Sequence, residues 1–250
     1  ELRDNPLVLI FLSFLCNRLI MAKKEIVRGI FNDIAPKYDL LNHLLSMNID
    51  KRWRRQAMKY IGEREKNCLL DVACGTGDFS IAACRMGVGR VTGIDISANM
   101  VEIGRKKVRE LGLEANVDLR IGDSEQMEFA TGEFDVVTVA FGVRNFEHLE
   151  AGLREMQRVL RSGGKVIILE FSMPEHFPMK QLYQFYFRRI LPVIGGWLSG
   201  NRGAYSYLPE SVMKFPQGQV FLDIMEKCGF RNTFRRKLSG GIASIYVGEK

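Results

Sequence analysis

The hydrophobic residues follow two different periods along the chain, one before about residue 62 and another after it. From Glu25 to Ile61 they recur at helical spacing, with basic clusters between them and without the alternation of a strand. From residue 68 onward, short apolar runs alternate with amphipathic segments of about 10–15 residues. This order predicts a helical N-terminal segment followed by a parallel sheet with helices on both faces.

The apolar runs predict seven strands, at 68–73, 90–96, 117–121, 134–141, 165–171, 233–238 and 243–247. The segments between the first five strands predict helices that end near residue 86, span 98–111 and span 149–160, and a last helix is expected at 218–228. Ser97 is the expected N-cap of the second of these helices. We therefore expect an α/β, Rossmann-like fold whose mostly parallel seven-stranded sheet ends in an antiparallel β-hairpin.

Residues 174–216 interrupt this rhythm, because they carry five of the seven prolines and a dense aromatic stretch. A helix pair packed on the sheet and an aromatic lid over a binding site both explain that composition. We expect one domain over residues 21–250, with residues 21–62 as a helical substrate cap and 174–216 as a lid insertion. Residues 1–20 are expected to be an upstream extension outside the fold, because Met21 and the residues after it resemble a natural start.

The composition is that of a globular protein, with 46% hydrophobic and 26% charged residues, which excludes a disordered or fibrous chain. The net charge of +7 is uneven, because residues 21–60 and 175–250 are basic whereas the segment between them is acidic. Such flanks favour an anionic partner, either nucleic acid or a lipid surface. The five cysteines contain no C-x-x-C pair, so neither a zinc site nor a disulfide framework is expected, and no other metal site is indicated.

A glycine-rich turn between the first strand and its helix is the main chemical signal. Gly75 and Gly77 let the backbone approach a ligand, while Asp71 lies on the strand just before them. Asp95 ends the second strand, where a carboxylate can accept both hydroxyls of a ribose, and Asp123 with Ser124 ends the third. A ligand with a ribose, a base and a positive charge but no phosphates fits this set, which predicts S-adenosylmethionine as the cofactor rather than NAD.

Three longer stretches resemble one family, the C-methyltransferases of ubiquinone and menaquinone biosynthesis. They are IAPKYDLLNHLLSMNIDKRWRR at 34–55, TVAFGVRNFEHLEAGLREMQRVLRSGGKVIILEFSMP at 138–174 and AYSYLPESVMKFP at 204–216. The resemblance covers the chain from Met21 to its end, and it departs from the family at Asp50, where histidine is frequent. It implies a class I methyltransferase sheet, a prenylated hydroquinone substrate, and cofactor contacts from Thr76, Asp95, Asp123 and Ser124.

Methylation of a ring carbon requires an electron-rich ring, so the reduced hydroquinone is the expected substrate. Its hydroxyl ionises near pH 10, and the enzyme has to remove that proton or stabilise the phenolate. Arg144 is expected to stabilise the phenolate, with Asn145 beside it at the carboxyl edge of the sheet. The other candidate catalytic residues are expected to close over the ring or contact its hydroxyls, with Asp39 or His43 as the base: Tyr38, Asp39, Asn42 and Tyr205.

The resemblance also implies where the protein acts and with which partners. We expect a cytoplasmic protein in transient contact with the inner face of the membrane, without nucleic acid as a partner, and a homodimer is left open. Two other classes of function remain at this point: another class I methyltransferase that acts on a different small molecule or on RNA, and a non-catalytic lipid-binding module. The residues do not distinguish a benzoquinol from a naphthoquinol substrate.

Overall fold

The computed structural model describes residues 23–39, 46, 48–62, 68–185, 189 and 202–250, so the expected extension at 1–20 lies outside the described residues. Seven strands form one sheet in the order β3-β2-β1-β4-β5-β7-β6. The first five strands run parallel, and β7 and β6 are antiparallel to their neighbours. The strands are β1 Cys68–Val72, β2 Arg90–Asp95, β3 Val117–Ile121, β4 Phe134–Ala140, β5 Leu160–Phe171, β6 Arg231–Leu238 and β7 Ala243–Glu249. The expected parallel sheet with a terminal hairpin is confirmed.

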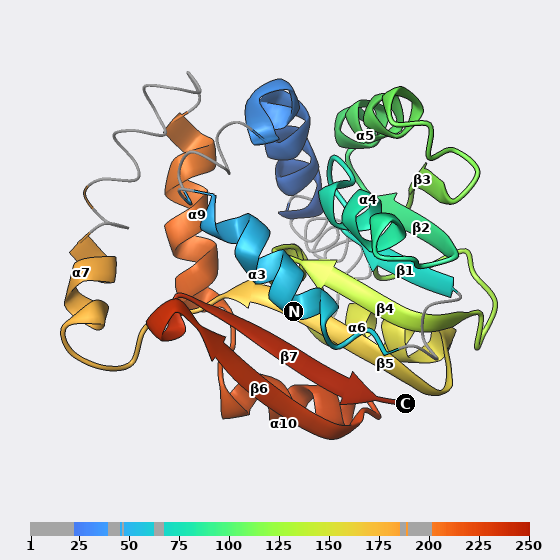
Figure 1. Ribbon diagram of the computed structural model, residues 1–250. Coiled ribbons are helices and arrows are strands. Elements are labelled where there is room, and N and C mark those ends of the chain that lie inside the picture. The colour runs from blue at the N-terminus through green and yellow to red at the C-terminus, as the bar shows by residue number, and fades with distance from the viewer. Residues whose placement is uncertain (1–22, 40–45, 47, 63–67, 186–188, 190–201) are drawn as a thin grey trace, which may run out of the picture.

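Helices cover both faces of this sheet (Figure 1). On one face, α3 (Ile49–Met58), α4 (Asp78–Arg85) and α5 (Ala98–Glu110) pack against the sheet through a shared apolar cluster. On the other face, α6 (Leu149–Val159) and α10 (Gln219–Lys227) do the same. Both faces of β1 are therefore buried, which explains why all its residues except Asp71 are apolar and no polar–apolar alternation is seen.

Local signals placed the ends of the predicted strands and helices to within two residues, except for the start of one strand. The hydroxyl of Ser97 accepts a hydrogen bond from the amide of Met100 at 3.2 Å, so the expected N-cap of α5 is confirmed. Strand β5 begins at Leu160 rather than Lys165, because Leu160 pairs with Phe134 of β4 and the register then shifts. A tertiary pairing of this kind overrides the turn signal of the glycines at 163 and 164.

The N-terminal segment and the insertion lie beside the carboxyl ends of the parallel strands. Residues 23–34 form a helix, followed by the short turn η1 (Ala35–Lys37) and then α3. In the insertion, the structure describes α7 (Met179–Phe185) and α9 (Arg202–Lys214), and α9 packs against the turn η3 (Val143–Asn145) that follows β4. Within the described ranges, no helix is both long enough and apolar enough to cross a bilayer.

Candidate active site

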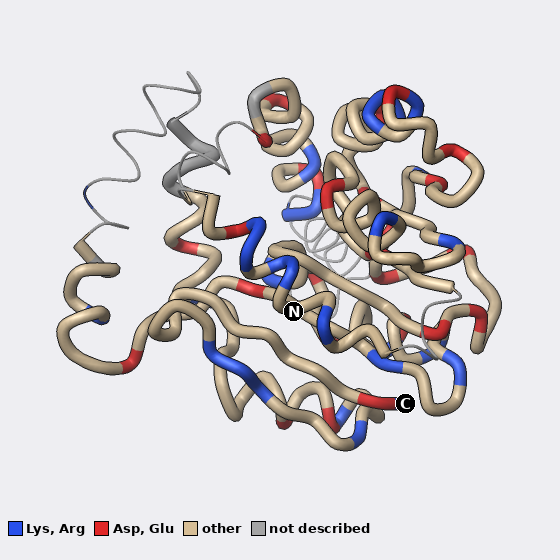
Figure 2. The backbone as a smooth tube through the Cα atoms, viewed as in Figure 1, with Lys and Arg blue, Asp and Glu red and all other residues tan. Residues whose placement is uncertain are grey.

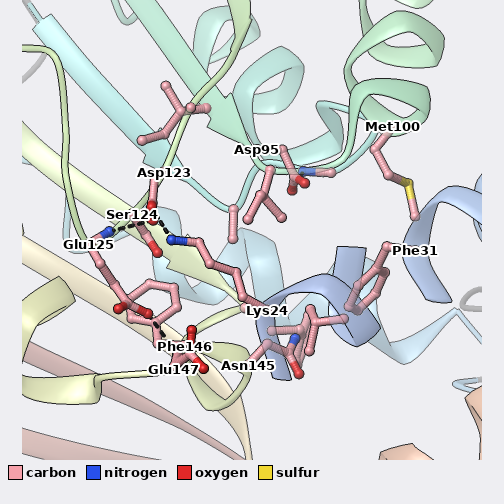
Figure 3. Close-up of a pocket in the computed structure, with 18 of the residues that line it drawn as sticks. Lys24, Phe31, Asp95, Met100, Asp123, Ser124, Glu125, Asn145, Phe146 and Glu147 are labelled. Carbon is pink, nitrogen blue, oxygen red and sulfur yellow. Dashed lines mark hydrogen bonds and ion pairs between the residues drawn. The ribbon is translucent and has the colours of Figure 1, made fainter. Parts of the chain in front are cut away.

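The carboxyl ends of β1, β2, β3 and β4 surround a pocket (Figure 3). Gly75 lies in its wall, in the turn after β1, with a φ of 56°, a conformation that favours glycine. The amide of Gly75 donates to Asp95 at 2.8 Å, and the amide of Ser97 donates to the other carboxylate oxygen at 2.8 Å. These two bonds hold the carboxylate at the end of β2, and burial raises its pKa. Asp95 thus presents fixed acceptors to the pocket, as predicted from its place in the sequence.

The loop after β3 forms the opposite wall of this pocket. Asp123 and Ser124 both line it, and Asp123 accepts the amide of Glu125 at 2.9 Å. The Asp123 carboxylate also forms an ion pair with Lys24, whose side chain extends from the helix at 23–34 across the pocket (Figure 3). Lys23 on the same helix donates to the carbonyl of Phe146 at 2.6 Å. The N-terminal helix is therefore part of this site. Local sequence patterns did not indicate that Lys24 would lie there.

Three of the residues predicted to bind the cofactor do not line this pocket. Asp71 is 1% exposed and accepts hydrogen bonds from Ser80 at 2.6 Å and Thr138 at 2.9 Å. Burial raises its pKa to about 6. Thr76 is 2% exposed and donates to Asp39 at 2.6 Å, and Gly77 is the N-cap of α4 with a φ of 78°. Asp71 therefore supports the turn from inside the sheet, and its side chain is not among those that line the pocket.

A second, more apolar pocket lies next to the first and shares Phe31, Tyr38 and Phe141 with it. Its lining comes from the helix at 23–34, α3, α9 and the ends of β4 and β5. The ring of Phe141 stacks near that of Phe171, with centroids 4.5 Å apart. The residues that line this pocket alone are Ile30, Ile34, Ser46, Asp50, Arg54, Arg144, Phe171, Tyr207 and Leu208. A flat, apolar ring in this pocket would lie directly beside a ligand of the first.

Arg144 reaches the second pocket from η3, and its side chain is only 7% exposed. Its Nη1 donates to the carboxylate of Glu170 at 2.7 Å and also to the carbonyl of Phe141, while Nε donates to Ser211 at 3.3 Å. Among the described residues, none accepts a hydrogen bond from Nη2 of Arg144. A guanidinium has five N–H donors and stays protonated, so this group has donors left for an oxygen in the pocket.

Asn145 lies at the boundary of the two pockets and connects η3 to α9. Its side-chain oxygen accepts a hydrogen bond from the hydroxyl of Tyr207 at 3.0 Å, and Asn145 itself lines the first pocket. Burial raises the pKa of Tyr207. Tyr207 was not among the predicted site residues, and neither was Glu170. Both belong to the stretches that carry the family resemblance, which is the only signal by which the sequence could have identified them.

The remaining candidates are not brought to the pockets by the described part of the chain. Asp39 forms an ion pair with Lys107 and accepts from Thr76, so it points toward α4 and α5 and lines neither pocket. This position does not support Asp39 as the base. Asn42 and His43 lie outside the described residues, and Tyr205 lies in α9 with a side chain outside them. Tyr38 lines both pockets, as expected for a residue that closes over the ring.

The first pocket fits the S-adenosylmethionine expected from the sequence. The Asp95 carboxylate lies where a strand end meets the glycine turn, which suits ribose hydroxyls, and Asp123 with Ser124 offers acceptors to an adenine amino group. Ile94, Ile96 and Met100 supply apolar walls for the base. Within the described ranges, no cluster of side chains has the composition of a metal site.

Comparison with known proteins agrees with this geometry. The chain is 43% identical over 229 residues to the demethylmenaquinone methyltransferase of Bacteroides fragilis, which covers 91% of this chain and 94% of that protein. It is 47% identical over 230 residues to the ubiquinone/menaquinone biosynthesis C-methyltransferase UbiE of Geotalea uraniireducens, which covers 91% and 97%.

Solved structures share the fold at low sequence identity. A SAM-dependent methyltransferase from Thermotoga maritima superposes with a TM-score of 0.63 and 18% identity, over 89% of this chain and 99% of that one. Phosphoethanolamine N-methyltransferase 2 of Haemonchus contortus, solved with S-adenosyl-L-methionine, superposes with a TM-score of 0.59 and 15% identity, over 79% and 52%. These two show a class I methyltransferase fold.

The family assignment rests on the length of the match. The sequence model of the ubiE/COQ5 methyltransferase family matches residues 19–250, which include every element of the sheet and both pockets. The match selects an S-adenosylmethionine-dependent C-methyltransferase over the non-catalytic module that the sequence had left open. This chain belongs to the ubiE/COQ5 methyltransferase family.

Proposed function

We propose that this protein transfers a methyl group from S-adenosylmethionine to a ring carbon of a prenylated hydroquinone. The substrate is demethylmenaquinol, the 2-polyprenyl-6-methoxy-1,4-benzoquinol of ubiquinone synthesis, or both. The observation that carries the proposal is the shared wall of Phe31, Tyr38 and Phe141 between the two pockets. An aromatic ring bound in the second pocket would lie next to a cofactor bound in the first, and the names of the relatives support quinone-ring chemistry.

Bound S-adenosylmethionine supplies an electrophilic methyl group, and the side chains of the second pocket prepare the ring. Arg144 offers a ring oxygen the Nη2 donors that no described residue accepts from, and negative charge develops on that oxygen as the hydroxyl loses its proton. Glu170 holds the guanidinium in place from a fully buried position. Asn145 and Tyr207 form a hydrogen-bonded pair beside it. Tyr38 and Phe141 exclude water from the reacting carbon.

The prenyl tail leaves the ring along the apolar part of the same pocket. Ile30, Ile34 and Leu208 line it, and Leu208 packs in one cluster with Tyr183 of α7, which carries exposed apolar side chains. These are Phe177 just before α7 and then Leu182 and Phe185 within it, which are 80%, 60% and 61% exposed. Exposed apolar side chains of this kind beside a lipid-binding pocket suit contact with acyl chains.

A basic surface supports contact with the membrane. Figure 2 shows Lys and Arg along both α3 and β6, and the ring contact of Tyr60 with Phe234 joins the two elements. The exposed cations of this surface are Lys51, Arg52, Arg55, Lys59, Arg231, Arg236 and Lys237. They suit the anionic lipids of the inner leaflet, each cation near such a surface contributing about 1 kcal/mol. The protein therefore acts as a peripheral enzyme that collects its lipid substrate from the membrane.

The proposal is tested by incubating the protein with S-adenosylmethionine and short-chain demethylnaphthoquinol or demethylbenzoquinol under anaerobic conditions. We expect a mass gain of one methyl group on the quinol ring and none when the oxidised quinone is offered, because the quinone carbon is electrophilic. Equal methylation of quinone and quinol contradicts the mechanism, and no methylation of either ring type contradicts the function. The two ring types in parallel establish which substrate this protein prefers.

A further inference from the structure

The second pocket contains a carboxylate that the chemistry above does not use. Asp50 lies in the first turn of α3, is 3% exposed and lines this pocket. Its Oδ1 accepts a hydrogen bond from the hydroxyl of Ser46 at 2.7 Å, and its Oδ2 forms an ion pair with Arg54 one helical turn later. Ionised carboxylates are almost never buried without partners, and Ser46 and Arg54 stabilise this one inside the pocket wall.

The helix that carries Asp50 is fixed relative to the sheet. The indole Nε1 of Trp53 donates to the hydroxyl of Ser239 in the turn between β6 and β7 at 2.9 Å. The guanidinium of Arg54 lies over the ring of Phe141, 5.7 Å from its centroid. Because Phe141 belongs to the wall between the two pockets, the Asp50–Arg54 pair is anchored close to the place where the methyl group is transferred.

Other acids near the ring are occupied elsewhere. Asp39 pairs with Lys107 outside both pockets, and Glu170 is fully buried against Arg144 and is absent from the pocket wall. Among the described residues that line the second pocket, Asp50 is the only carboxylate. The groups that face the same pocket are the guanidinium groups of Arg54 and Arg144 and the phenols of Tyr38 and Tyr207. Both cations stay protonated, so Asp50 is the only group among these that is suited to accept a proton at neutral pH.

We propose that Asp50 is the proton acceptor for a ring hydroxyl of the hydroquinone, an inference that rests on the proposed function. The hydroxyl proton moves to the carboxylate, and the electron pair of the O–H bond raises the electron density of the ring. The ring carbon then forms a bond with the methyl carbon while the S–CH₃ bond breaks and its electron pair stays on sulfur, which yields S-adenosylhomocysteine. The methylated carbon then loses its proton to water, which restores the aromatic ring as a phenolate, and the phenolate oxygen takes back the proton held by Asp50. Arg144 stabilises the oxygen, and Asp50 takes the proton.

The test compares Asp50→Asn and Asp50→His with the wild type. Asparagine cannot take the proton, so kcat should fall about 10²-fold, within the range for a lost general base. The rate of this variant should rise with pH toward 9, because solvent then supplies more of the phenolate. Histidine, whose neutral imidazole can also accept a proton, should restore most of kcat. Its rate should show an acidic limb near pH 6.5, where imidazole takes a proton, and the residual rate of Asp50→Asn should not.

Asp223→Asn is the matched control, because Asp223 also pairs with a residue four positions away, Gln219, on the exposed face of α10. Melting temperatures of all variants separate loss of folding from loss of chemistry. A loss for Asp50→Asn that is equal at every pH, or an Asp50→His variant no more active than Asp50→Asn, overturns the proposal and leaves Asp50 a structural residue. If the wild type methylates no quinol at all, the proposed function itself fails. This outcome differs from the two above, in which the wild type is active and only the role of Asp50 is wrong.

Discussion

Replacing Arg144 by alanine separates its structural role from its chemical one, provided that its partner is changed as well. Arg144 and Glu170 are 7% and 0% exposed, so the single substitution leaves Glu170 as a buried charge without its partner. Breaking such a pair costs about 3–5 kcal/mol. At about 2–4 °C per kcal/mol for a domain of this size, the melting temperature should fall by about 6–20 °C. Measured alone, a loss of activity in Arg144→Ala would therefore be ambiguous.

The double variant Arg144→Ala with Glu170→Gln removes the unpaired charge. In the wild type, both carboxylate oxygens of Glu170 accept backbone amides, those of Phe171 and Arg144. Glutamine has only one acceptor oxygen and can keep one of these two bonds. We therefore expect about half of the lost melting temperature to return. The kcat should stay about 10²–10³-fold below wild type, because no donor replaces Nη2 at the ring oxygen. Arg144→Lys should keep the fold and recover only part of kcat, since an ammonium lacks the planar fork.

The assay is steady-state methylation of the quinol together with thermal unfolding of the same preparations. Cofactor affinity from titration calorimetry is the control, and it should barely change, because Arg144 lines only the second pocket. If kcat returns together with the melting temperature in the double variant, Arg144 is only scaffolding, and its assigned role at the phenolate is wrong.

Three other predictions follow from single contacts. Asp95→Ala should weaken S-adenosylmethionine binding by about 2 kcal/mol, about 30-fold, because it removes a charged acceptor; calorimetry within twofold of wild type would contradict the assignment. Lys24→Gln should tighten cofactor binding up to about fivefold, since Asp123 is freed from a partly exposed ion pair, and weaker binding would show that Lys24 helps to hold the ligand. Burial raises the pKa of Asp71 from 3.8 to about 6, so the folded state binds a proton that the unfolded state releases in this range. The free energy of unfolding should therefore fall by up to about 3 kcal/mol as the pH rises from 4 to 6. Urea titrations should show that the free energy of unfolding of Asp71→Asn depends less on pH in this range.

The sequence alone was sufficient for the features that depend on neighbouring residues. The alternation of apolar runs and amphipathic segments predicted the sheet, because burial of strands on both faces and of helices on one face imposes these periods. The cap at Ser97 and the turn at Gly75 were predicted for the same reason, since each is decided by a few consecutive residues. Asp95 and Asp123 were placed at the pocket by a topological rule, that parallel strands end at one edge.

The tertiary structure alone decided which side chains meet across that edge. Tyr207 donates a hydrogen bond to Asn145, 62 residues earlier in the chain, and Lys24 forms an ion pair with Asp123, 99 residues later. No local sequence pattern carries information over such separations. The side chain of Asp71 lies inside the sheet, because Thr138 of the neighbouring strand β4 donates a hydrogen bond to its carboxylate. Pairing is selected by the summed packing and hydrogen bonding of the whole fold, so the residues that bind a ring become a set only after the chain has folded.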